Sequence, residues 1–267
     1  MNNTFVRLNG LTIENFKNVK NGQLSFANPR KAYRTSVLGL YGQNGSGKTA
    51  LIDAIELLQL ALKGQPIPSK FADYINVEAQ NASLHYEFTV ASDIGEYQAF
   101  YDFELRAERI ESPQNMAVSS SEEPHYRAVI AAEVLSYSYE DSQIKVRKSP
   151  LIDTASTKVF APAGKYSCLI GKDKEVAMNL MVDKKVVMGA SRSFIFSREL
   201  LTAMRNNQAG ITNPEYKRHM LLIESLVRYG NFELFVINTA NSGIISMNML
   251  PLSFKYEDGT NGAVGNI

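Results

Sequence analysis

The sequence has a single cysteine, Cys168, almost no net charge and no long apolar run. One cysteine excludes an intrachain disulfide, so we expect a reducing compartment and a plain buried thiol. The 28 basic and 27 acidic side chains leave a net charge of +1, which gives no global field for nucleic acid or an anionic membrane. No apolar run reaches the roughly 18 residues that span a bilayer, and the N-terminus does not resemble a signal peptide. We therefore expect a cytoplasmic protein with no membrane partner.

The most informative stretch of the sequence is glycine-rich: residues 42–49 have the sequence Gly-Gln-Asn-Gly-Ser-Gly-Lys-Thr. It fits the phosphate-binding loop pattern, in which Gly, four residues, Gly, Lys and Ser or Thr follow one another. Backbone N–H groups of such a loop form an anion-binding nest, and glycine lets the backbone approach phosphate oxygens closely. We expect Lys48 to act as the catalytic lysine on the β- and γ-phosphates, and the Thr49 hydroxyl to ligate Mg²⁺. The phosphate cradle is predicted to consist of Asn44, Gly45, Ser46, Gly47, Lys48 and Thr49.

The flanks of the loop predict the strand and helix that this motif requires. Residues 36–41 have the apolar character of a short buried strand. Residues 49–63 have helical character, with Gly64 just past the expected end. The polar residues of this helix recur at spacings of three and four, so the rest of its surface is expected to be buried. They are Asp53, Glu56, Gln59 and Lys63. We assign Asp53 a structural role.

The remaining chain predicts one ATPase-like α/β domain in three parts. Residues 1–64 hold two strands, with a turn at Gly22, followed by the loop and first helix. Residues 65–190 read as an antiparallel β lobe, with a polar segment near 111–124 that is expected to be mobile. Residues 191–267 form a helical lobe and terminal strands, including a helix that starts at Asn213-Pro214 and ends at Gly230. The strands of the middle part are expected at 82–90, 97–105, 128–139 and 143–147, and the helical pattern from Ala190.

Two further stretches narrow the family. Residues 15–18, Asn-Phe-Lys-Asn, precede the loop, and residues 52–55, Ile-Asp-Ala-Ile, lie inside the helix that follows it. With the loop, they resemble the N-terminal half of ABC-type ATPases of the SMC, Rad50 and RecF kind. The closest resemblance is to the bacterial AAA-15/AAA-21 group, which includes OLD-like ATPases. It implies a P-loop NTPase fold of the ABC-ATPase head type, with an antiparallel β lobe and a helical lobe.

The resemblance also implies ligands and partners. It implies ATP with Mg²⁺, and a homodimer in which two heads enclose two nucleotides. It places Lys17 and Asn18 near the ribose and the α-phosphate. It gives no clear position for the glutamine that contacts ATP between the lobes, for which Gln143 and Gln208 are the candidates.

Three elements of these ATPases are missing from the sequence. The Walker B segment ends in Asp-Glu, where the Asp holds Mg²⁺ through water and the Glu positions the attacking water. The nearest stretch, residues 220–224, has no Asp and has helical character, and residues 100–104 alternate as a hairpin strand would. The signature Leu-Ser-Gly-Gly and a switch histidine are also absent. We expect the chain to be the N-terminal part of a longer ATPase, without the C-terminal half of the head, that cradles ATP-Mg²⁺ but does not hydrolyse it competently alone.

Four functions remain open at this point. The first is an ATP-driven dimerisation switch that controls an effector, such as a nuclease, in phage defence or abortive infection. The second is a RecF- or Rad50-like machine for DNA repair or chromosome maintenance, which the balanced charge and the lack of heptad arms do not favour. The third is a P-loop kinase, which would not call for residues 15–18 on a preceding strand. The fourth is a non-catalytic interaction domain.

Overall fold

The computed structural model describes residues 4–26, 38–43, 45–110, 125–155 and 161–237. The chain divides into two compact units, Met1–Phe235 and Val236–Ile267, and only Val236 and Ile237 of the second are described. Asn44, the polar segment at 111–124 and the strands expected beyond residue 237 therefore lie outside the described residues. None of the described helices is long and apolar enough to cross a membrane.

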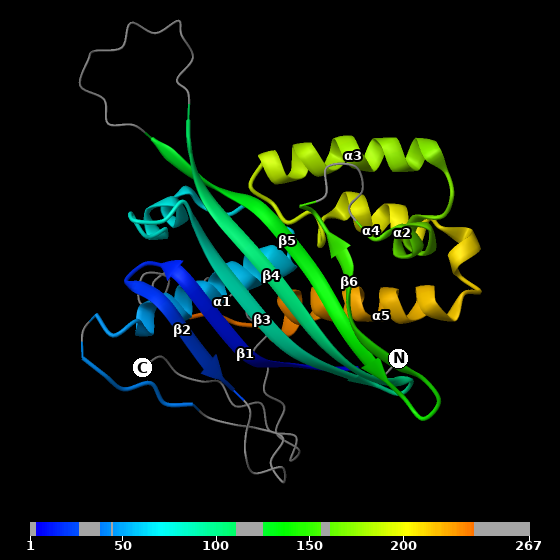
Figure 1. Ribbon diagram of the computed structural model, residues 1–267, viewed down its shortest axis with the longest axis horizontal. Coiled ribbons are helices and arrows are strands. Elements are labelled where there is room, and N and C mark those ends of the chain that lie inside the picture. Colours follow the sequence, from blue (N-terminus) through cyan, green and yellow to red (C-terminus); the bar gives the residue numbers. More distant parts are fainter. Residues whose placement is uncertain (1–3, 27–37, 44, 111–124, 156–160, 238–267) are drawn as a thin grey trace, which may run out of the picture. The chain divides into compact units, whose positions relative to one another are not determined.

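A six-stranded antiparallel sheet organises the first unit, in the order β2-β1-β3-β4-β5-β6 (Figure 1). Its strands are β1 (Phe5–Phe16), β2 (Val19–Ser25), β3 (Asn81–Ser92), β4 (Gly95–Arg109), β5 (Tyr126–Glu140) and β6 (Lys145–Asp153). The predicted antiparallel strands of the middle region are confirmed. β1 pairs with β3 along almost its whole length, so the two N-terminal strands and the strands of the middle region share one sheet.

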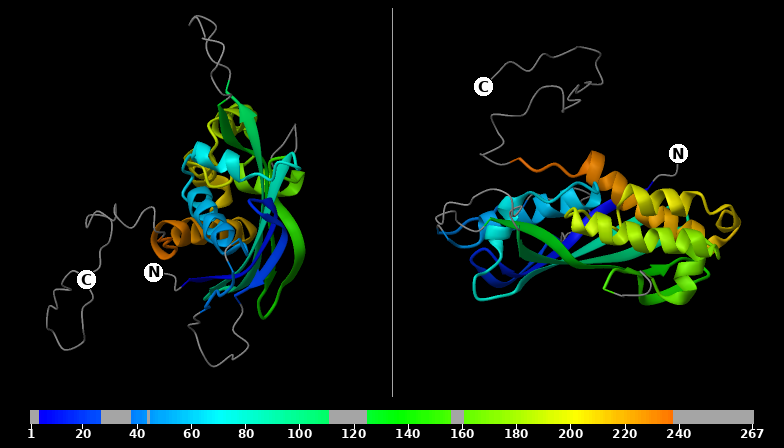
Figure 2. Two further views of the ribbon diagram at one scale, coloured as in Figure 1. Left: turned by 90° about the vertical axis from the view of Figure 1, so that its left-hand side faces the viewer. Right: turned by 90° about the horizontal axis from the view of Figure 1, so that it is seen from above.

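Helices cover one face of this sheet, and the other face is open (Figure 2). They are α1 (Lys48–Leu62), α2 (Ala163–Ile170), α3 (Lys174–Gly189), α4 (Arg198–Arg205) and α5 (Pro214–Arg228), with the 3₁₀ helices η1 (Ser69–Tyr74) and η2 (Gln208–Gly210) and the π-helix η3 (Tyr229–Glu233). Side chains of a strand point alternately to the two faces. On β3, Leu84 and Tyr86 are buried beneath the helices, whereas His85 between them lies on the open face.

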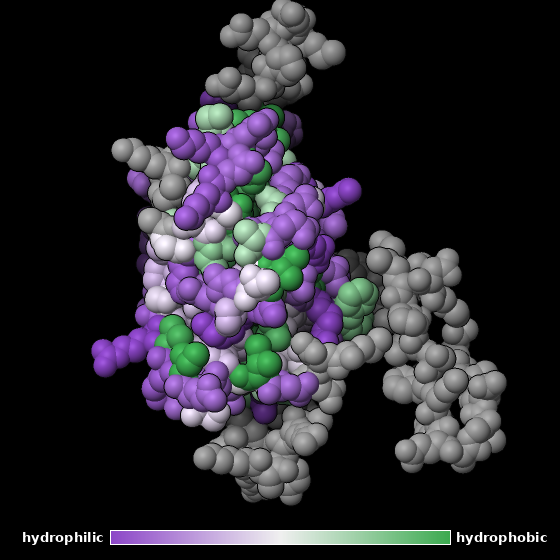
Figure 3. All heavy atoms as spheres, turned by 90° about the vertical axis from the view of Figure 1, so that its right-hand side faces the viewer, coloured by the Kyte–Doolittle hydropathy of each residue, from purple (hydrophilic) through white to green (hydrophobic). Residues whose placement is uncertain are grey.

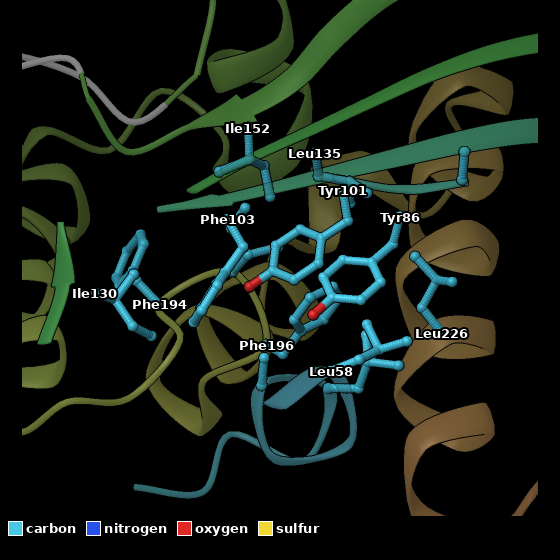
Figure 4. Close-up of a cluster of buried hydrophobic side chains, with 14 of the residues drawn as sticks. Leu58, Tyr86, Tyr101, Phe103, Ile130, Leu135, Ile152, Phe194, Phe196 and Leu226 are labelled. Atoms are coloured by element: carbon cyan, nitrogen blue, oxygen red, sulfur yellow. The ribbon is translucent and has the colours of Figure 1, made fainter. Parts of the chain in front are cut away.

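The core joins the sheet to α1 and α5. Tyr86 and Tyr101 are fully buried, with their ring centroids 6.1 Å apart, and the Tyr86 hydroxyl donates to the Ala54 carbonyl of α1 at 2.7 Å. Figure 4 shows Leu58 of α1 and Leu226 of α5 meeting these rings. Burial of each such side chain stabilises the fold by about 1.5–3 kcal/mol. The first helix is thus fixed against the sheet along its buried face.

The far end of α1 is held by the π-helix. Gly230 of η3 lies so close to Leu62 that a Cβ at Gly230 would come within 2.4 Å of the Leu62 Cβ. The Gln59 side-chain amide donates to the Leu234 carbonyl. These contacts bring residues 230–234 against the last turn of the helix that begins at the phosphate-binding motif.

The turn between the first two strands differs from the expectation. The chain turns at Lys17 and Asn18, and Gly22 lies inside β2, opposite Ile13. The reason is tertiary: the Lys17 N–H donates to the Tyr74 carbonyl at 2.5 Å, which fixes the turn five residues earlier than glycine alone suggests.

The buried strand expected at residues 36–41 is not present in its described part. Residues 38–43 have no regular secondary structure, and Leu38, Leu40 and Tyr41 are 49%, 38% and 96% exposed. A strand needs a hydrogen-bonded neighbour, and none of the described strands pairs with this segment. The apolar character of the segment therefore predicts burial wrongly in this chain.

Helical structure begins earlier than expected, at Ala163 rather than at Ala190. Periodicity does not predict α3, because its apolar residues do not form one buried stripe. Three of them, Met178, Val182 and Val186, are more than 60% exposed. The start of α5 is confirmed, with the Asn213 side chain accepting from the Glu215 N–H at 2.9 Å as its cap, but Gly230 does not end the helical segment, because it lies inside η3. The segment from Phe232 begins inside η3, not in a strand.

Glu133 is a buried carboxylate in β5 that ties the sheet to the segment before α4. It is 1% exposed, and it accepts hydrogen bonds from the Tyr101 hydroxyl at 2.7 Å and the Ser193 hydroxyl at 2.6 Å. The N–H groups of Phe194 and Ile195 donate to its other oxygen at 2.6 and 3.1 Å. Burial raises the pKa of Glu133, although the four donors lower it.

The side of the first unit that lies at the right in Figure 1 carries mainly hydrophilic residues (Figure 3). Hydrophobic residues on this side are scattered among them rather than joined into one patch. Single exposed apolar residues are ordinary on a protein surface, so this view gives no sign of a large apolar interface.

On the open face of the sheet, His85 lies between two carboxylates. Its Nδ1 is 2.6 Å from Asp102 Oδ1, and its Nε2 is 3.3 Å from Glu87 Oε1. The hydrogen bond with Asp102 raises the pKa of His85 above its ordinary value of 6.5, although partial burial opposes the shift. The imidazolium is therefore favoured in the folded protein.

This pKa shift predicts a pH-dependent contribution to stability. It is fully present below pH 6.5, the unfolded pKa, and is lost as the pH rises through the folded pKa. Between about pH 6 and pH 9, the free energy of unfolding should fall by about 0.5 kcal/mol more in the wild type than in His85→Gln. Urea unfolding at each pH measures the difference, which should shrink in about 1 M NaCl because the partners are half exposed. Parallel pH profiles for the two proteins would contradict the prediction.

Candidate nucleotide-binding site

The glycine-rich loop leads directly into the first helix. α1 begins at Lys48, and its N-cap, Gly47, has no side chain to accept a hydrogen bond from the first turn. The first turn carries no acidic residue. Since the first N–H groups of a helix have no partner within the helix, this end presents donors and the positive end of the dipole to an anion. The geometry therefore fits a phosphate group.

Glycine is needed in the loop for two different reasons. Gly45 and Gly47 both have a φ of 86°, in the left-handed region that other residues rarely adopt. At Gly47 a Cβ would also come within 2.9 Å of Val19 Cγ2, so β2 packs directly against this backbone. The conformation of the loop is thus set partly by its own glycines and partly by the neighbouring strand.

The Lys48 ammonium lies inside the curve of the loop. It donates to the carbonyl oxygens of Gly42 and Gln43, both at 2.8 Å, and to the Ser46 hydroxyl at 3.0 Å. These acceptors hold a cation at the place where a phosphate would add its own oxygens. A bound phosphate would therefore share or take over the ammonium, which is already directed at the cradle.

Thr49 is exposed in the first turn of α1, where its hydroxyl is available as a Mg²⁺ ligand. Among the described residues, no group of three or more His, Cys, Asp or Glu side chains could hold a metal ion. The site fits Mg²⁺ only as part of a metal–nucleotide complex, in which phosphate oxygens and water supply the other ligands.

The β1–β2 turn brings Lys17 and Asn18 to the loop, as their sequence positions suggest. The Asn18 side-chain amide donates to the Gly45 carbonyl. The Lys17 ammonium, however, pairs with the Asp53 carboxylate of α1 and lies 3.9 Å from the centre of the Tyr74 ring. Contact of either residue with a ribose or an α-phosphate stays a prediction. Tyr74 belongs to no motif, and the sequence offers no signal for it.

A hollow of about 350 Å³ adjoins the loop. Ser46, Gly47 and Lys48 form one wall, and β1 and β2 together with Leu40 and Tyr41 form the others. Its size is at the lower end of small-molecule sites, and its walls are mainly apolar. It could receive the part of a nucleotide that extends from the phosphates.

The two candidate glutamines lie elsewhere in the first unit. Gln143 is exposed in the turn between β5 and β6, and Gln208 is exposed in η2. Neither lines the hollow beside the loop. Their role as the glutamine between the lobes stays untested.

Comparison with known proteins agrees with this geometry. No curated protein matches the chain. A family model described as an AAA domain matches residues 10–209, which include the β1–β2 turn, the loop and α1. Since this match covers most of the chain, the protein belongs to the AAA domain family of P-loop ATPases, which is found in SMC- and Rad50-like proteins.

Proposed function

We propose that this chain binds ATP with Mg²⁺ at residues 42–49 and the adjoining hollow. The observation that carries the proposal is the uncapped start of α1, with the Lys48 ammonium held inside the loop. A cation and free helix N–H groups at one point form a site for a polyphosphate, and the family supports ATP as that ligand.

A titration with fluorescent methylanthraniloyl-ATP tests this function. Binding should be saturable, should be displaced by unlabelled ATP and should strengthen when Mg²⁺ is added. The Lys20→Ala variant is a suitable control, because Lys20 on β2 pairs with Glu78 at 2.6 Å and lies outside the loop. Binding that ATP does not displace would contradict the proposal.

The broader role that we propose is an ATP-driven dimerisation switch of the AAA-15/AAA-21, OLD-like type. In such a protein, two heads would enclose two nucleotides in the cytoplasm and control an effector, such as a nuclease, in phage defence or abortive infection. The motifs at residues 15–18 and 52–55 support this class. Exposure of Ser46 and Thr49 supports it as well, because a second head needs access to the phosphates.

The alternative is a RecF- or Rad50-like ATPase that acts on DNA. Two observations favour it less. The longest described helix, α3, has 16 residues, which is too short for a coiled-coil arm. The open face of the sheet carries Glu87, Asp102 and Glu104 together with His85 and Lys148, so it does not present a uniformly basic surface to the phosphate groups of DNA. DNA binding with a steep salt dependence would favour the alternative.

Binding is expected without competent hydrolysis in the 267-residue chain. The sequence contains no run of four apolar residues followed by Asp-Glu, so it offers no Walker B glutamate to position the attacking water. Phosphate release should stay far below the roughly 1 per second at the low end of typical enzymes. A coupled phosphate assay, with Lys48→Ala to reveal contaminating ATPases, measures it. Robust turnover that depends on Lys48 would refute this expectation.

A further inference from the structure

The turn between β1 and β2 holds two non-glycine residues in the left-handed region. Asn15 and Lys17 each have a φ of 54°. A lysine in this region costs about 1–2 kcal/mol, so the surrounding structure must impose it. The end of η1 and the residues after it do so: the Asn76 N–H donates to the Asn15 carbonyl at 2.9 Å, and the Lys17 N–H donates to the Tyr74 carbonyl at 2.5 Å. Strain of this kind is usually retained where a side chain has to be directed.

The strained turn directs the Lys17 side chain onto α1. Its ammonium pairs with the Asp53 carboxylate and lies over the Tyr74 ring. The two side chains are 21% and 8% exposed, so water screens the pair only weakly. Removing one partner would leave a poorly hydrated charge alone, which is costly. The pair therefore fixes the turn to the helix in one position.

The two residues after Lys17 contact the phosphate loop itself. The Asn18 amide donates to the Gly45 carbonyl, and Val19 packs against Gly47. Three successive residues thus contact α1 and two glycines of the loop. Any shift of the turn relative to α1 would move the groups that shape the loop.

We propose that Lys17 and Asp53 are positioning residues for the phosphate loop. Their ion pair holds the β1–β2 turn so that Asn18 and Val19 set the curvature of the loop around a phosphate. Lys17 acts on the position of the turn through its pair with Asp53. The proposal rests on the proposed ATP binding and goes beyond it, because it assigns how an element outside the loop determines affinity.

The test measures the dissociation constant of Mg-ATP for Lys17→Met, Asp53→Asn and the double variant. Each single variant should bind about tenfold more weakly, as is typical when a supporting residue is lost. The double variant should bind no more weakly than the worse single variant, because both remove the same pair. Lys17→Arg should restore most of the affinity. Glu56→Gln is the matched control, since Glu56 pairs with Lys70 at 2.9 Å further along the same helix, and it should stay within about twofold of wild type.

A second measurement keeps the test decisive if Asp53→Asn folds poorly. In nucleotide-free Lys17→Met, the amides of Ser46 and Leu51, which donate to the Gln43 and Gly47 carbonyls, should exchange hydrogen faster than in wild type, whereas those of β4 should not. Normal affinity in both single variants would overturn the proposal. So would loss of affinity in Lys17→Met alone, because Lys17 would then contact the nucleotide directly. Failure of the wild type to bind ATP would instead overturn the proposed function.

Discussion

Replacement of Lys48 by alanine should weaken Mg-ATP binding about 100-fold, since hydrogen bonds to charged groups contribute roughly 1.5–3 kcal/mol. The variant removes the ammonium that the loop holds between the Gly42 and Gln43 carbonyls. Without it, those carbonyl oxygens face the incoming phosphate with no cation between them, so repulsion adds to the lost attraction. Isothermal titration calorimetry of both proteins with Mg-ATP measures the change.

The fold should survive this substitution. Lys48 contacts its own loop rather than the core, so the melting temperature should change by less than about 2 °C. Lys20→Ala again serves as the matched control, because it removes an exposed lysine without touching the loop. If Lys48→Ala bound ATP as tightly as wild type, the nucleotide would have to bind elsewhere.

The largest loss of stability is expected from Glu133→Ala, at about 4 kcal/mol. The substitution leaves four buried donors without an acceptor: the hydroxyls of Tyr101 and Ser193 and the N–H groups of Phe194 and Ile195. Each orphaned group costs about 1–3 kcal/mol, partly offset because the carboxylate no longer has to be buried. Urea unfolding at neutral pH, followed by far-UV circular dichroism, measures the free energy of unfolding.

Two further variants separate this hydrogen-bond network from a general effect of losing a glutamate. Glu133→Gln should cost less than Glu133→Ala, because its carbonyl still accepts from both N–H groups, although its amide leaves the two hydroxyl hydrogens without their acceptor. Glu140→Ala, at the exposed end of the same strand, removes a pair with Lys145 and should cost less than about 0.5 kcal/mol. Equal losses in Glu133→Ala and Glu140→Ala would be incompatible with the buried network.

Alternation predicts the strands of this protein well, for a physical reason. The sheet is covered on one face only, so apolar and polar residues alternate along its strands. On β3, for example, Leu84 and Tyr86 are buried, and His85 between them lies on the open face. The first helix is predicted equally well, because its polar side chains share one stripe and Gly64 follows its end. Both features depend on local periodicity.

The elements that were predicted wrongly depend on partners elsewhere in the chain. The segment at 38–43 has the apolar character of a strand but no described neighbour to pair with. The turn at Lys17 and Asn18 is fixed by the backbone of Tyr74, which no local pattern reveals. Helix α3 lacks a single apolar stripe, so periodicity does not identify it. Tertiary contacts decide each of these cases.

In the candidate site, too, some features can be predicted from local sequence and others depend on tertiary contacts. The phosphate loop is recognisable from spacing alone, because the glycines, Lys48 and Thr49 must follow one another to build it. The pairing of Lys17 with Asp53 joins residues 36 positions apart and could not be derived from either one. Glu133 left one faint signal, since it is the only carboxylate in the otherwise apolar and hydroxyl-bearing stretch 128–139. A lone carboxylate that is buried beneath the helices, as Glu133 is, must find donors.

The contacts at the two ends of α1 connect the phosphate loop to residues 230–234. It has 15 residues and is about 22 Å long. Its first residue, Lys48, belongs to the loop, and its last, Leu62, lies against Gly230, where there is no room for even a methyl group. A tilt of α1 at the loop would therefore press Leu62 against residues 230–234. Helix α1 therefore connects the loop to the last residues of the first compact unit.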